Sequence, residues 1–110
     1  MQYGLSDYTL ATLKSIFSKY QSIKEVILYG SRAIGNYRNG SDIDISLKTD
    51  SSFAFDNLLL ISRDFNDSDM PYFVDVSIYD KINNKNLLSH IERCGKVLYR
   101  STSPTLPPPQ

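Results

Sequence analysis

The chain has 110 residues, with 12 basic and 12 acidic side chains and a formal net charge of zero. This length fits one domain with one hydrophobic core, and the charge balance argues against extended nucleic-acid binding through bulk charge. The single cysteine, Cys94, excludes an intramolecular disulfide and a cysteine-based metal site within one chain. Because the N-terminus shows no basic-then-apolar leader pattern and no run approaches transmembrane length, we expect a cytoplasmic protein outside the membrane.

The spacing of apolar residues predicts four helices and four strands that alternate along the chain. The helices are expected over residues 6–20, 31–35, 52–66 and from a cap at Asn83 or Asn84 to Gly95, and the strands over residues 25–29, 42–47, 71–79 and 96–100. This order predicts an α/β fold in which helices pack on a small mixed sheet. We expect the first two strands to run antiparallel, because the end of one and the start of the next must meet around one ligand. Residues 101–110 are rich in proline and are expected to form a flexible tail.

Two aspartates open the second predicted strand. Polar and apolar residues alternate strictly from Asp42 to Leu47, which is the period of a strand with one buried face. Asp42 and Asp44 therefore share the polar face, where same-face neighbours lie roughly 6.5–7 Å apart along the backbone. Their carboxylates could converge on one divalent cation such as Mg²⁺. The alternative is that the pair is simply the solvated face of an edge strand, although aspartate is depleted in strands.

A glycine-rich turn lies before this acidic pair. Gly30 ends the first apolar run, and Gly30-Ser31 begins a turn into Arg32. Glycine lets the backbone approach a ligand closely, and N–H groups at the start of a helix favour anions. The turn is therefore expected to hold a phosphate chain, with the Ser31 hydroxyl donating and Arg32 or Arg38 adding positive charge. Taken alone, such glycines are equally typical of ordinary turns.

A third carboxylate occurs in the next predicted strand. Val74, Val76 and Ile78 form one face of this segment, which leaves Asp75 on the other face. An aspartate inside an apolar strand is costly to bury unless it is paired or binds a cation. Asp75 is therefore a candidate to pair with a positive group or to bind a cation, and the alternative is an exposed-face aspartate.

The turn and the acidic pair together resemble a known signature. Gly30-Ser31, ten intervening residues and Asp42-Ile43-Asp44 are similar to the GS-x10-DxD signature of the DNA-polymerase-β-like nucleotidyltransferase superfamily. Within it, the small size and the pattern GSRAxG…SDIDI resemble the minimal nucleotidyltransferases of bacteria and archaea, which are typically encoded beside a helical HEPN-type protein as a toxin–antitoxin pair. The resemblance covers residues 5–100 and implies a polymerase-β-like nucleotidyltransferase domain over residues 1–100.

This resemblance implies an Mg²⁺-dependent enzyme that transfers AMP from ATP to a hydroxyl acceptor. It implies that the catalytic residues, which would bind two Mg²⁺ ions, are Asp42, Asp44 and Asp75. It implies that the nucleotide-binding residues are Gly30, Ser31 and Arg32. The acceptor would be a tyrosine of the HEPN-type RNase toxin. The chain would then act as an antitoxin within a hetero-oligomer.

Two other interpretations stay open. The chain could be a nucleotidyltransferase subunit that modifies a small molecule, or a non-catalytic module that neutralises its partner by occlusion. The presence of the full set of carboxylates and of the Gly-Ser turn favours catalysis, because a pure binding module needs neither. His90 has no evident catalytic partner in the sequence, so we expect it to have a surface or helix-packing role.

Overall fold

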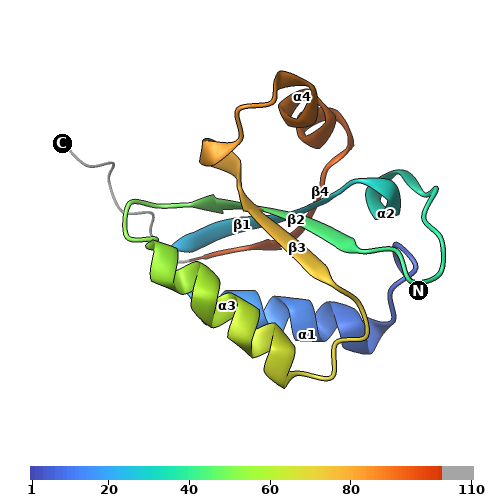
Figure 1. The fold of residues 1–110 in the computed structure, drawn as a ribbon, viewed down its shortest axis with the longest axis horizontal. Coiled ribbons are helices and arrows are strands. Elements are labelled where there is room, and N and C mark those ends of the chain that lie inside the picture. The colour runs from blue at the N-terminus through green and yellow to red at the C-terminus, as the bar shows by residue number, and fades with distance from the viewer. Residues whose placement is uncertain (103–110) are drawn as a thin grey trace.

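A computed structural model describes residues 1–102 of the chain. Its elements alternate as the sequence predicts (Figure 1). In chain order they are α1 (Asp7–Ser18), β1 (Ile23–Tyr29), α2 (Ser31–Ile34), β2 (Ile43–Thr49), α3 (Phe55–Asp67), β3 (Val74–Ile78), the 3₁₀ turn η1 (Tyr79–Lys81), α4 (Lys85–Cys94) and β4 (Lys96–Arg100). Within the described residues, no helix is both long enough and apolar enough to span a membrane.

The four strands form one mixed sheet in the order β3-β2-β1-β4. Strand β1 runs antiparallel to both β2 and β4, whereas β2 and β3 are parallel. The parallel pair needs a crossover, and α3 provides it, since parallel neighbours cannot be joined by a tight hairpin. The α/β prediction and the antiparallel pairing of the first two strands are therefore confirmed.

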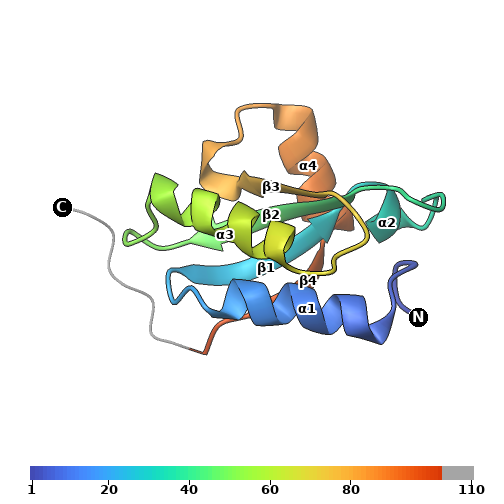
Figure 2. The same cartoon turned by 60° about the horizontal axis from the view of Figure 1, so that its bottom comes forward.

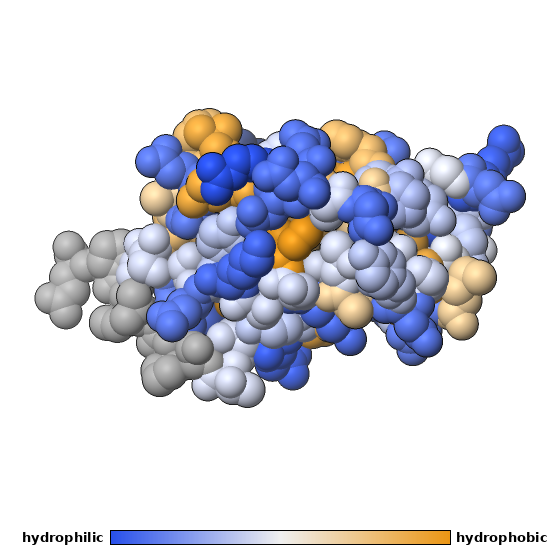
Figure 3. All heavy atoms as spheres, turned by 90° about the horizontal axis from the view of Figure 1, so that it is seen from below, coloured by the Kyte–Doolittle hydropathy of each residue, from blue (hydrophilic) through white to orange (hydrophobic). Residues whose placement is uncertain are grey.

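One face of the sheet carries the main hydrophobic core. Helices α1 and α3 lie side by side against this face (Figures 1 and 2). Alternation along β2 buries Ile43, Ile45 and Leu47 completely in this core, together with Phe17 of α1 and Ile61 of α3. The outer surface on this side is mostly hydrophilic, with separate hydrophobic patches (Figure 3). The opposite face of the sheet is therefore left for the polar side chains of the same strands.

Helix α4 covers part of that opposite face. Ile91 packs there against Ile27 and Tyr29 of β1 in a second, smaller cluster. Only Gly95 separates α4 from β4, and a Cβ atom on this residue would overlap the carbonyl oxygen of Ile91 and the side chain of Ile27. Glycine at this corner thus allows α4 to lie directly on β1, next to the turn that follows β1.

The element bounds differ from the predicted ones where side chains define local turns. Helix α3 begins at Phe55, three residues later than predicted, because the Asp50 carboxylate accepts hydrogen bonds from the backbone N–H and the hydroxyl of Ser52. Strand β4 occupies the predicted residues 96–100. Most of the predicted tail, residues 103–110, lies outside the described residues.

Candidate active site

The candidate site is a row of polar side chains across three strands. Asp44, in β2, lies between Tyr29 of β1 and Asp75 of β3 in the strand register. Neighbouring strands are about 4.8 Å apart, and all three side chains project from the face opposite the main core. Asp42 lies directly before β2 and is exposed. The structure therefore brings Asp44 and Asp75 together from positions 31 residues apart, with Asp42 at the end of the same strand.

The negative charges in this row act on one another. Partial burial raises the pKa of Asp44, and the charges of Asp75 and Asp42 raise it further, while His90 acts in the opposite direction. Burial also raises the pKa of the Tyr29 hydroxyl, with smaller contributions from Asp44 and Asp75. Asp44 is thus the centre of an electrostatic cluster in which a proton, a cation or another positive group is favoured.

The chemistry of this cluster fits Mg²⁺. Hard cations bind carboxylate oxygens, and Mg²⁺ usually takes one or two carboxylates and completes its shell with phosphate oxygens and water. Over residues 1–102, no group of three or more His, Cys, Asp and Glu side chains is arranged to hold a metal ion by itself. The carboxylates would therefore supply charge and some of the ligands to a bound Mg²⁺, while a phosphate-bearing substrate would have to supply others.

The Gly30 turn lies directly against Asp44. Gly30 has φ 76° and ψ −156°, a combination that only glycine adopts readily. A Cβ atom at this position would overlap the Asp44 carboxylate. The carbonyl oxygen of Gly30 accepts hydrogen bonds from Ala33 and Ile34, which form the short helix α2. The turn and the acidic strand are consequently one packed unit, and Ser31 is half-buried within it.

His90 reaches the same turn from α4. Its Nε2 atom accepts a hydrogen bond of 2.9 Å from the backbone N–H of Gly30, and its ring packs edge-on against Tyr29 with centroids 6.1 Å apart. Sequence reasoning found no partner for His90, because its partner is a backbone group 60 residues away. The one available signal was its place among Leu87 and Ile91 on the sheet-facing side of α4.

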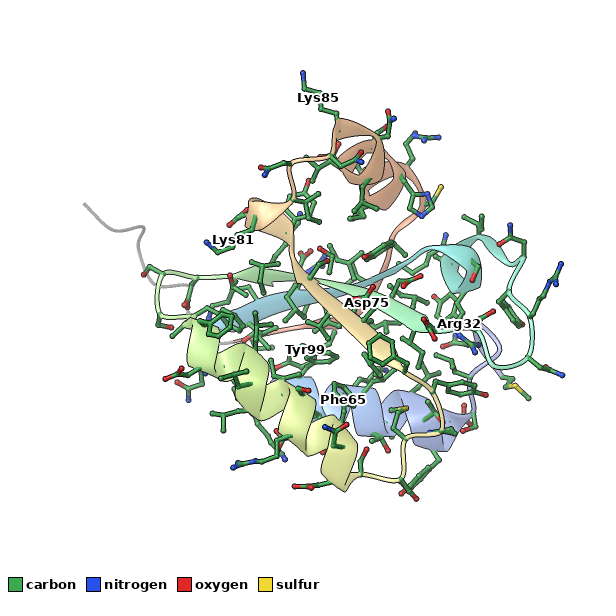
Figure 4. The ribbon with its side chains drawn as sticks, viewed as in Figure 1. Arg32, Phe65, Asp75, Lys81, Lys85 and Tyr99 are labelled. Carbon is green, nitrogen blue, oxygen red and sulfur yellow. The ribbon has the colours of Figure 1, made fainter. Side chains whose placement is uncertain are left out.

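Arg32 lies beneath the turn and is only 2% exposed (Figure 4). Its guanidinium donates two hydrogen bonds to the carbonyl oxygen of Ser41, at 2.7 and 3.1 Å, and one of 3.0 Å to that of Tyr3. The same group stacks on the rings of Tyr72, 4.5 Å from the centroid, and Tyr37, at 5.3 Å. In this conformation Arg32 ties the glycine-rich loop to the N-terminal segment through its hydrogen bonds and ring contacts. Its role in nucleotide binding stays a prediction.

Replacing Arg32 should therefore cost mainly stability. We expect Arg32→Met to lower the free energy of unfolding by about 3 kcal/mol, because buried carbonyl oxygens lose a charged donor. Arg38→Met, in the same loop but exposed, is the matched control and should change stability little. Urea unfolding followed by circular dichroism measures both. A fully stable Arg32→Met protein that had lost nucleotide affinity would instead support the predicted phosphate contact.

A groove opens beside Asp75. It has a volume of about 440 Å³ and lies between α3 and β3, with Phe65, Met70 and Tyr72 among its lining residues and Asp75 at β3. Phe73, next to Tyr72 on its border, is 67% exposed. Strand β3 is at the edge of the sheet, so this groove lies along the sheet edge that contains Asp75.

Comparison with known proteins agrees with this geometry. Residues 11–103 match the family model described as "Polymerase beta, Nucleotidyltransferase". Comparison with curated protein sequences gave no match. Among solved structures, one of a toxin–antitoxin with AMP-PNP has 17% identity and a TM-score of 0.68, covering 84% of this chain and 74% of that chain.

Two further solved structures are similar. The toxin–antitoxin MntA-HpeT, in a mutant form, has 14% identity and a TM-score of 0.65, covering 84% of this chain and 74% of that chain. The tri-AMPylated HEPN toxin of Shewanella oneidensis in complex with its MNT antitoxin has 14% identity and a TM-score of 0.64, covering 88% and 74%. At such identities the likeness shows a common fold. Because the family model spans most of the chain, including the Gly30 turn and all three aspartates, the chain belongs to the polymerase beta nucleotidyltransferase family.

Proposed function

We propose that the chain transfers AMP from ATP to a tyrosine hydroxyl of a helical HEPN-type toxin and thereby acts as its antitoxin. The observation that carries this proposal is the row of Asp42, Asp44 and Asp75, in which Asp44 packs directly against Gly30 of the Gly30-Ser31 turn. Support for the partner comes from the similar structures, which hold a HEPN toxin that is AMPylated and a nucleotide analogue, AMP-PNP. We place the reaction in the cytoplasm, where ATP and Mg²⁺ are available.

Each part of the site has a role in this reaction. Asp42 and Asp44 would bind Mg²⁺, with Asp75 contributing to a second position. The bound ions would polarise the phosphates and stabilise the charge on the departing pyrophosphate. The Gly30-Ser31 turn would hold the phosphate chain. Asp75 would take the proton from the acceptor hydroxyl as its oxygen bonds to the α-phosphorus, and the bond from that phosphorus to pyrophosphate would break.

The acceptor must come from another molecule in this proposal. Within residues 1–102, all the helices and strands belong to one small sheet and the helices that pack on it. None of them fills the groove beside Asp75. A partner that enters along the edge of β3 would bring its hydroxyl to Asp75 and leave the Gly30 turn free for ATP. A hetero-oligomer with the toxin satisfies this requirement.

Intact-mass spectrometry tests the function directly. The full chain is incubated with ATP, Mg²⁺ and the HEPN-type protein encoded beside it, and the masses of both proteins are measured. We expect one or more AMP additions on the partner and none when the chain carries Asp42→Asn and Asp44→Asn together. Tight binding without any addition would instead support neutralisation by occlusion. AMP transfer to a supplied aminoglycoside, with none to the partner, would support a small-molecule acceptor.

A further inference from the structure

We propose that His90 is a positioning residue that fixes the Gly30 turn against the catalytic aspartate. The hydrogen bond from the Gly30 N–H to Nε2 of His90 is the direct link between α4 and the site. The structural part of this proposal rests on the contacts of the described residues, and its functional part rests on the nucleotide transfer proposed above.

The Gly30 peptide is held from two sides. Its N–H donates to His90, while its Cα lies so close to the Asp44 carboxylate that no side chain fits between them. A glycine has more backbone freedom than any other residue, so this peptide would otherwise sample several orientations. The backbone dihedrals of Gly30 set the direction in which the chain continues to Ser31. By holding the Gly30 N–H, the imidazole therefore fixes the turn relative to Asp44.

The imidazole is itself held in place. Its ring lies at 76° to that of Tyr29, and the next residue, Ile91, is only 3% exposed in the cluster with Ile27 and Tyr29. Its Nε2 atom is the one that accepts the hydrogen bond from the Gly30 N–H, at 2.9 Å. Helix α4 therefore contacts the turn through one acceptor atom, whose direction is fixed by the packing of the helix on the sheet.

Two variants distinguish this role from simple packing. His90→Phe keeps a flat ring against Tyr29 and removes the acceptor, whereas His90→Gln loses the ring but keeps an acceptor on a side chain of similar reach. If His90 only packs, the Phe variant should be closer to the unmodified protein in Gly30 amide exchange and in nucleotide transfer. If His90 positions the turn, the Gln variant should be closer in both. Lys85→Ala, at the first residue of the same helix and pointing into solvent (Figure 4), is the control.

The first readout does not depend on catalysis. Amide hydrogen exchange of Gly30, measured by ¹H–¹⁵N NMR on the full chain, should be clearly faster in His90→Phe and near the unmodified rate in His90→Gln and Lys85→Ala. Equal Gly30 exchange in the unmodified and Phe proteins would overturn the proposal. This result is informative even if the chain transfers no nucleotide at all.

The second readout is nucleotide transfer with ATP and the HEPN-type partner. We expect kcat of His90→Phe to fall about 100-fold, as for a small misplacement of reacting groups, with a smaller change in KM for ATP. His90→Gln should recover most of this loss. Transfer by His90→Phe that equalled or exceeded transfer by His90→Gln would overturn the positioning role. Absence of transfer in the unmodified protein would count against the proposed function and leave the exchange result to decide the structural role.

Discussion

Asp44→Asn is expected to lower the rate of AMP transfer by about 1000-fold, which corresponds to roughly 4 kcal/mol of transition-state stabilisation. Asp44 is the central carboxylate of the row and is flanked in the register by Asp75 and Tyr29. An amide of the same shape fills the same space but is a much weaker ligand for Mg²⁺. Initial rates of AMP incorporation into the partner, measured with saturating ATP and Mg²⁺, give the size of the loss.

The same change should not destabilise the fold. The pKa of Asp44 is raised by burial and by the charges of Asp75 and Asp42, so the ionised carboxylate is unfavourable in the metal-free protein. Removing that charge relieves repulsion, and we expect Asp44→Asn to unfold at the same or a higher urea concentration at neutral pH. A variant that lost transfer because it had unfolded would contradict this explanation.

The sign of the pH dependence follows from the same shift. Because the pKa of Asp44 is raised above its ordinary value of 3.8, the folded protein binds more protons than the unfolded chain between that value and the raised one. The contribution of Asp44 to stability is therefore lost as the pH rises through this window. The Asn variant lacks this contribution.

Addition of Mg²⁺ and ATP should raise the thermal midpoint of the unmodified protein more than that of Asp44→Asn.

Local patterns were sufficient to predict which face of each strand carries the aspartates. The alternation from Asp42 to Leu47 determined which side chains of β2 are buried, and the apolar face of β3 left Asp75 on the polar side. Because strand side chains have a period of two, this assignment requires only the strand and its buried face. That Asp75 lies next to Asp44 depends on the parallel register of β2 and β3, which the residue pattern did not predict.

The surroundings of the turn depend on contacts between distant segments. Arg32 donates to the carbonyl oxygen of Tyr3, and Gly30 donates to His90. Backbone groups have no signature in a sequence, so no residue pattern identifies them as partners. An arginine after a Gly-Ser turn predicts a phosphate contact from sequence. The sequence is the same whether the charge faces a ligand or the carbonyl oxygens of a neighbouring loop. The tertiary fold decides between these possibilities.

Gly30→Ala is expected to produce the second large loss, and its cause can be separated from backbone strain. The alanine would have to adopt φ 76°, which costs of order 1–3 kcal/mol, and its methyl group would also overlap the Asp44 carboxylate. Either the turn or Asp44 must then move. A displacement of about 1 Å can cost about 100-fold in rate, so we expect a loss of transfer of that size together with lower stability.

Gly40→Ala provides the matched control, because Gly40 also has a positive φ, 82°, but a Cβ atom there would meet no atom within 4 Å. Both variants should lose stability in urea unfolding, since both place a side chain at a positive φ that residues other than glycine rarely adopt. Transfer should fall sharply only in Gly30→Ala. If the two variants lost transfer equally, the loss would come from strain in the glycine-rich loop. A selective loss in Gly30→Ala would instead show that catalysis depends on direct packing between the Gly30 turn and Asp44, the contact that His90 holds from the opposite side.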